Sequence, residues 1–153
     1  MAEEQQPSFQ IEKIYVKDVS LEIPGAPQVF LEAQGPQLEI QVRNESAQFA
    51  DGLFEVTVTV TVTAKTGDKT QFLAEAAQAG IFSVRNVPPA DLEPLLAIAC
   101  PTILYPYARE TISDLVTRGG FPPVLLAPVS FEALYAQRMQ QQAAAGARIE
   151  LAS

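Results

Sequence analysis

Few residues of this chain could take part in catalysis. The 153 residues include no histidine and a single cysteine, Cys100. Without imidazole, the Ser-His-Asp and Cys-His nucleophile pairs and most transition-metal sites are excluded. Cys100 lies among apolar residues, directly before Pro101 and with no cationic side chain close in sequence, so we expect a buried, unreactive thiol. The sequence therefore predicts a protein that is not an enzyme and that has no cofactor.

The remaining polar candidates have simpler structural explanations. Asp91 and Glu93 suit the first turn of a helix, where the macrodipole favours acidic residues, better than an acid/base pair. Gly119-Gly120 follows a predicted helix and so predicts its end, whereas a phosphate-binding loop would precede a helix. Arg109-Glu110 lies inside an apolar helix, and two interpretations stay open: a buried ion pair, or the polar edge of the helix.

Composition and charge limit the classes of partner. Hydrophobic residues make up 48% of the chain and charged residues 18%, which is typical of a globular domain. Ten basic and eighteen acidic residues give a net charge of −8, so we expect a basic protein as partner rather than nucleic acid. The polar start MAEEQQPS does not fit a signal peptide, and no apolar run approaches the ~18 residues of a membrane span. We expect a cytoplasmic protein with no direct membrane insertion, and one thiol fits a reducing compartment.

Alternating apolar residues predict a four-stranded antiparallel sheet. The first strand covers 9–21 with one or two bulges, because the pairs Phe9/Ile11, Ile14/Val16 and Val19/Leu21 fall out of phase with one another. The second strand covers 37–43 and is followed by a polar turn through 44–52. The third begins at Leu53 and carries the run VTVTVTVT, and a tight hairpin at 66–68 leads to the fourth strand at 69–84. Residues 22–37 are irregular, with three prolines and two glycines.

Helical patterns follow the strands. A short helix is predicted over 91–100, and Pro101 marks either a break or the first turn of the next helix, which covers 102–118 and contains an Asp114–Arg118 pair at i,i+4 spacing. Residues 121–129 are extended because of their prolines, and Ser130 caps a last helix. The predicted class is α+β, with the helices on one face of the sheet. The domain spans 9–142, between a flexible leader at 1–8 and a flexible tail at 143–153.

Two surfaces of the predicted fold are candidate binding sites. Val29-Phe30-Leu31 and the segment 121–126 are apolar without belonging to a regular element, so they either cover the core or line a groove for extended apolar peptide. The second surface is the threonine face of the third strand. Together with nearby carboxylates it is either an exposed acidic docking face or a merely solvated outer face.

Several motifs resemble the SecB family of protein-export chaperones. They are GIFSV at 80–84, CPTILYPYARETISDLVTRGGFPP at 100–123 and LAPVSFEAL at 126–134. The likeness extends from about Phe9 to Gln142. The alanine-rich tail and Ala79, where a glycine is usual, depart from the family pattern.

The resemblance implies a cytoplasmic homotetramer, a dimer of dimers, which holds unfolded precursor proteins without ATP and delivers them to the SecA motor ATPase. It also implies three sets of site residues. The SecA-docking residues are Asp18, Glu22, Leu73 and Glu75. The client groove is formed by Val29, Phe30, Leu31, Leu126, Phe131 and Tyr135. The tetramer interface is formed by Leu104, Tyr107, Ala108, Ile112 and Leu115.

An alternative from the same family is a SecB-like chaperone dedicated to a toxin–antitoxin pair, with one antitoxin as its client.

Overall fold

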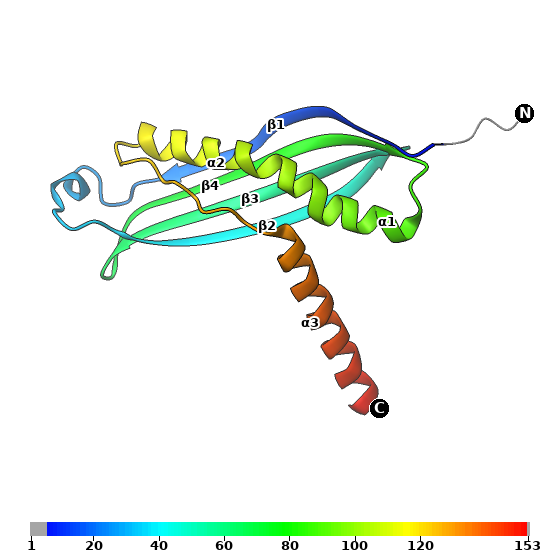
Figure 1. Cartoon of the computed structure of the whole chain (residues 1–153). Coiled ribbons are helices and arrows are strands. Elements are labelled where there is room, and N and C mark those ends of the chain that lie inside the picture. Colours follow the sequence, from blue (N-terminus) through cyan, green and yellow to red (C-terminus); the bar gives the residue numbers. More distant parts are fainter. Residues whose placement is uncertain (1–5, 153) are drawn as a thin grey trace, which may run out of the picture.

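The computed structural model describes residues 6–152, and in it an antiparallel sheet is covered by helices on one face (Figure 1). This arrangement confirms the predicted α+β class. The strands are β1 (Ser8–Glu22), β2 (Gln37–Ala50), β3 (Leu53–Thr66) and β4 (Lys69–Arg85). The helices are the short 3-10 helix η1 (Gln28–Leu31), α1 (Pro89–Pro94), the π-helical turn η2 (Leu95–Ala99), α2 (Cys100–Arg118) and α3 (Phe131–Ala152). No helix within residues 6–152 is both long and apolar enough to cross a membrane.

The strand order in the sheet is β1-β4-β3-β2. Strands β2, β3 and β4 follow one another as hairpins, and the last hairpin turns at Gly67-Asp68, where Gly67 has a φ of 59°. Strand β1 pairs with β4 instead of β2. The connection from β1 to β2 must therefore cross the whole end of the sheet, which explains its length.

Strand β1 contains the two irregularities that its sequence predicts. They lie between Ile11 and Lys13 and between Val16 and Asp18. Each extra residue shifts the alternation by one position, so the three out-of-phase apolar pairs all turn toward the helical side of the sheet. The two bulges thus keep six apolar residues on one face of a single strand.

Strand β2 is longer than predicted, and the polar turn expected at 44–52 is wrong. Residues Asn44–Ala50 continue the strand and pair with β3 as far as Ala50 opposite Leu53, so only Asp51-Gly52 remains as the turn. Backbone pairing with β3 decides this, because an edge strand with solvent on its outer side needs no apolar alternation there.

The core lies between the valines of β3 and helix α2. Val56, Val58, Val60 and Val62 are fully buried, together with Phe72 and Phe82 of β4. Leu104, Ala108 and Ile112 recur at four-residue spacing on α2 and are also fully buried against the sheet. These three residues were expected at the tetramer interface, but within one chain they are core and are not free to contact another subunit.

The helical region is more continuous than predicted. Backbone angles stay helical from α1 through η2 into α2, and the Cys100 N–H donates to the carbonyl of Leu95, five residues back. Pro101 therefore lies in the first turn of α2 without a break, where its missing N–H is tolerated beside the π-helical turn. At the other end, Arg118 and Asp114 form the predicted ion pair, at 3.0 Å.

Helix α3 begins where predicted, since the Ser130 Oγ accepts a hydrogen bond from the Ala133 N–H at 3.1 Å. It then extends away from the sheet (Figure 1) and continues to Ala152, through the residues expected to form a flexible tail. Of the expected leader, residues 1–5 lie outside the described residues, and β1 already begins at Ser8.

Candidate functional site

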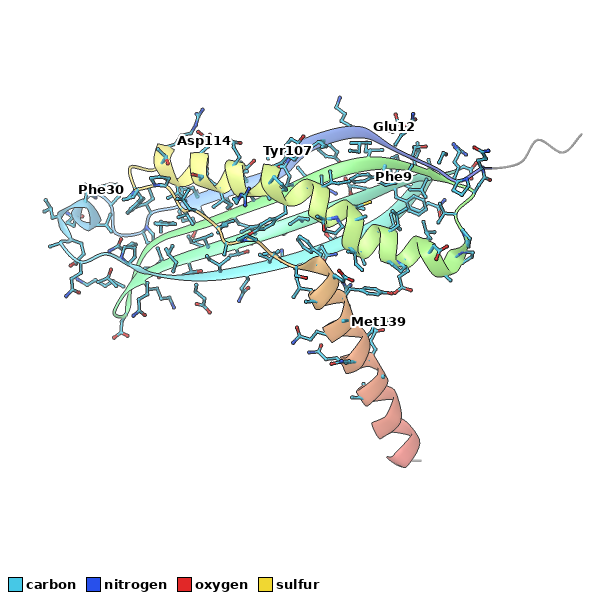
Figure 2. The ribbon with its side chains drawn as sticks, viewed as in Figure 1. Phe9, Glu12, Phe30, Tyr107, Asp114 and Met139 are labelled. Carbon is cyan, nitrogen blue, oxygen red and sulfur yellow. The ribbon has the colours of Figure 1, made fainter. Side chains whose placement is uncertain are left out.

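An apolar groove lies where the β1–β2 connection meets the segment that follows α2. It encloses a cavity of about 390 Å³. Its walls are Val29 and Phe30 from η1, residues 32–36, Leu38 of β2, Gln71 and Phe72 of β4, and residues 120–124. Figure 2 shows Phe30 at this end of the sheet, with Phe9 toward the opposite end. The groove is therefore built entirely from segments that lack a regular periodic pattern and from the ends of strands.

Three aromatic rings connect the surface of this groove to the core. The Phe30 and Phe121 ring centroids are 5.3 Å apart, and those of Phe121 and Phe72 are 4.7 Å apart. Exposure falls along the series, from 50% at Phe30 to 2% at Phe72. Because Phe30 presents half of its ring to solvent while the rest is held by Phe121, the groove offers a preformed apolar surface.

Gly120 is required at the base of the groove for two reasons. Its φ of 91° is a conformation that other residues rarely adopt. A Cβ at this position would also lie 3.0 Å from Cε1 of Phe30. The predicted helix-ending glycine thus has a second role, since it lets the Phe30 ring approach the backbone.

Buried polar groups hold both walls of the groove in place. On one side, the Gln71 amide donates to the Thr66 hydroxyl at 2.6 Å and to the carbonyl of Gln34 at 3.4 Å. On the other, the Tyr105 hydroxyl of α2 donates to the carbonyl of Ala127 at 2.6 Å. The bonds to Gln34 and to Ala127 each tie an irregular segment to a regular element, so neither wall depends on loop packing alone.

The predicted groove residues do not all lie together. Val29 and Phe30 line the cavity, and Leu31 is 86% exposed at its outer end. Leu126 and Phe131 were expected at the groove surface but are buried in the core. Phe131 packs edge-on against Tyr105, with ring centroids 5.8 Å apart, while Tyr135 lines a separate hollow beside α1, η2 and β2.

Sequence reasoning missed Leu38 and Phe72 as parts of the groove. Both fall on the inward phase of their strands, which predicts core positions. Only the path of the β1–β2 connection over the strand ends makes them groove walls as well.

The outer face of the sheet brings the predicted docking residues together. Glu22 pairs with Leu73, Ser20 with Glu75 and Asp18 with Ala77, so all of these side chains share the face opposite the helices. Asp18 and Glu22 are exposed. Glu75 is partly buried and accepts a hydrogen bond from the Thr61 hydroxyl at 2.7 Å.

The threonines themselves are not the exposed surface that the sequence suggested. Thr57 and Thr59 are only 4% and 6% exposed in the single chain. They lie on a central strand opposite Arg43 and Glu45 of β2, whose longer side chains flank these short ones. The exposed parts of this face therefore lie toward its two edges, and the predicted docking residues form the acidic part along β1 and the adjoining β4.

A hydrogen-bonded cluster on the same face joins the edge strand β1 to β3. Glu55 of β3 accepts hydrogen bonds from the Tyr15 hydroxyl and from Lys17 Nζ, the latter at 2.7 Å. The Lys17 and Tyr15 hydrogen bonds hold the pKa of the Glu55 carboxyl below its usual value. Burial, with the Glu55 carboxylate beside it, raises the pKa of Tyr15 to about 12.

The other polar candidates carry no reactive geometry. Cys100 is fully buried, and burial raises its pKa to about 12, as expected for an unreactive thiol. Arg109 and Glu110 are not a buried pair: Glu110 is exposed, and the Arg109 guanidinium lies 5.9 Å from the Tyr105 ring centroid. Of the remaining interface candidates, Tyr107 is exposed (Figure 2) and Leu115 is partly buried. Within residues 6–152 no three His, Cys, Asp or Glu side chains cluster as metal ligands.

Comparison with known proteins identifies the family. The family described as preprotein translocase subunit SecB matches residues 2–142. A protein-export protein SecB of Chromobacterium violaceum is 63% identical, over 95% of this chain and 99% of that protein. The protein-export protein SecB of Methylobacillus flagellatus is 62% identical, over 94% of this chain and 92% of that protein.

A solved structure supports the fold. It is a SecB-like chaperone of Mycobacterium tuberculosis in complex with a peptide from an antitoxin, and it is 21% identical with a TM-score of 0.66. The match covers 79% of this chain and 90% of that one. Taken with the family match and the near-full-length relatives, these findings show that the chain belongs to the SecB family of protein-export proteins.

Proposed function

We propose that this export chaperone holds unfolded precursor proteins in its apolar groove and passes them to the SecA motor ATPase. The observation that carries the proposal is the graded aromatic series from Phe30 to Phe72, which presents apolar surface in a cavity that is already formed. An unfolded chain exposes apolar side chains, and a groove of this kind binds them through burial without reading a sequence.

The walls of the groove also suit varied clients. One wall is the β1–β2 connection, which is free of long regular structure, and the other is the extended segment at 121–130. Pro122 and Pro123 stiffen the second wall, while Leu31 and Leu125 present nearly bare side chains beside it. A surface of this composition can adapt to different apolar segments, and holding them in this way needs no ATP.

Exposed apolar residues along β1 support assembly into a tetramer. Val16 and Val19 point to the helical side of the sheet but lie beyond the cover of α2, and Tyr107 is exposed on α2. Strand β1 is also a sheet edge with unpaired backbone groups. Natural proteins cover such edges, so we propose pairing with a second copy and a dimer of dimers in the cytoplasm, where several grooves on one assembly strengthen the hold on one long client.

The acidic outer face is the proposed docking surface for the motor. Asp18, Glu22 and Glu75 place negative charge around the apolar Leu73 on one flat face, and the chain as a whole carries a net charge of −8. A basic segment of the motor would be attracted to this surface. The face lies on the opposite side of the sheet from α2, so docking and client binding use different surfaces.

The test separates these two activities on one sample. Changing both Asp18→Lys and Glu75→Lys is expected to weaken or abolish binding to SecA, measured by calorimetric titration, and wild-type binding is expected to weaken as salt is raised. The same double variant is expected to keep an unfolded client from aggregating, measured by light scattering. Undiminished SecA binding would remove these residues from the docking surface, and loss of client holding would place them at the groove.

A role limited to one antitoxin is the second proposal from the same family. The identity of 62–63% to proteins named for export favours the general role. If the protein kept only one client from aggregating and did not protect several unrelated unfolded proteins, the dedicated role would be favoured instead.

A further inference from the structure

One bulge decides which side chains of β1 reach the outer face. Val16 lies opposite Gln78 and Asp18 lies opposite Ala77, so Lys17 is an extra residue with no partner of its own on β4. Before the bulge the outward positions on β1 include Tyr15. After it they are Asp18, Ser20 and Glu22. If Lys17 instead paired in regular alternation, with no bulge, Val19 and Leu21 would turn outward and the two carboxylates inward.

Contacts from both sides of the sheet hold this bulge. On the outer side, Glu55 accepts hydrogen bonds from Tyr15 and Lys17, the residues on either side of Val16. These bonds reach across β4, where the small Ala77 and Ala79 lie between β1 and β3. A carboxylate on β3 therefore connects to an edge strand that is not its neighbour in the sheet.

On the inner side, the buried Gln78 provides the second contact. Its amide donates to the Tyr15 carbonyl at 3.2 Å, and its side-chain oxygen accepts from the Thr111 hydroxyl of α2 at 3.0 Å. A bulge interrupts the regular ladder, and here a side chain supplies the hydrogen bond to a carbonyl beside it. Tyr15 is thus held by its backbone from one face and by its side chain from the other.

We propose that Glu55 is a positioning residue for the SecA-docking surface: by binding Tyr15 and Lys17 it fixes the β1 bulge that turns Asp18 and Glu22 outward. This inference rests on the proposed docking function, and Glu55 acts through β1 without touching the motor. Loss of the Glu55, Tyr15 or Lys17 side chain would therefore weaken SecA binding, as loss of the acidic docking residues does.

The test compares Glu55→Ala with the partner variants Lys17→Met and Tyr15→Phe. We expect Glu55→Ala to weaken SecA binding by about tenfold or more, and each partner variant to weaken it in the same direction, because all of them loosen the bulge. Amide hydrogen exchange over residues 14–20 is expected to speed up in the same variants. Glu55→Gln, which keeps an acceptor oxygen, is expected to restore part of the binding and of the protection.

Controls make the outcomes decisive. Glu39→Ala removes an exposed carboxylate from the same face, on β2, and is expected to leave both SecA binding and exchange over 14–20 unchanged. Normal binding by Lys17→Met and Tyr15→Phe beside weak binding by Glu55→Ala would overturn the proposal, since Glu55 would then contact the motor directly. Faster exchange with undiminished binding would overturn it as well.

The hydrogen-exchange measurement does not depend on the motor. If wild-type protein fails to bind SecA, the docking function fails, while the exchange data still show whether Glu55 holds the bulge. Unchanged exchange in Glu55→Ala, together with an unchanged thermal midpoint, would reject the positioning role whatever the motor does.

Discussion

The aromatic series in the groove predicts that the exposed ring, Phe30, matters mainly for client holding, whereas the buried ring, Phe72, matters mainly for stability. Phe30→Ser removes a ring that is 50% exposed, whereas Phe72→Ala removes one that is 2% exposed. A fully buried phenylalanine contributes about 1.5–3 kcal/mol through burial, so the half-exposed Phe30 contributes about 1 kcal/mol. Its contact with Phe121, at 5.3 Å between centroids, adds about 0.5–1.5 kcal/mol.

The expected loss of stability for Phe30→Ser is therefore about 1.5–2.5 kcal/mol, which lowers the thermal midpoint of a domain of this size by about 3–10 °C. Leu31→Ser is expected to change stability by less than about 0.5 kcal/mol, because Leu31 is 86% exposed. Phe72→Ala is the core control and is expected to lose about 3–5 kcal/mol, enough to lower the midpoint by about 6–20 °C.

Client holding is expected to follow a different order. The double variant Phe30→Ser/Leu31→Ser should bind an unfolded client several-fold more weakly while it stays folded, measured by light scattering of the aggregating client with thermal denaturation of the same sample. Phe30→Ser that loses as much stability as Phe72→Ala would show that Phe30 is a core residue. If the folded double variant holds the client as well as the wild type does, the groove is not the client-binding site.

Three further predictions follow from single contacts. Gly120→Ala should destabilise the protein by about 1–3 kcal/mol in thermal denaturation, because alanine is strained at a φ of 91° and its Cβ would press on the Phe30 ring. Cys100 should resist a thiol reagent at pH 8 and react at once in denaturant, because burial raises its pKa to about 12; fast labelling of the native protein would refute this. The pKa of Glu55 is lowered in the folded state by Lys17 and Tyr15, so its contribution to stability is present above pH 4.5 and is lost as pH falls through the folded pKa; Glu55→Gln should flatten this acid limb.

Local patterns in the sequence determine much of the fold. The three out-of-phase apolar pairs on β1 predict its bulges, because a strand that must keep six apolar residues on one face has to insert residues where the alternation slips. The Gly67-Asp68 turn, the cap at Ser130 and the helix end at Gly119-Gly120 are similarly local, since each depends on backbone preferences of a few neighbouring residues. The burial of Cys100 also follows from its apolar neighbours.

Which surfaces stay free was decided only by tertiary packing. The apolar periods of α2 and of 126–131 are equally compatible with a core, a groove or an interface, because periodicity reports an apolar face and not what covers it. Tertiary packing places Leu104 and Phe131 in the core and leaves Phe30 half exposed. Thr57, between β2 and β4, is only 4% exposed, and pairing with β3 extends β2 through a polar stretch. These outcomes depend on contacts between elements, including the neighbouring strand of a hairpin, and the periodicity of one segment does not report them.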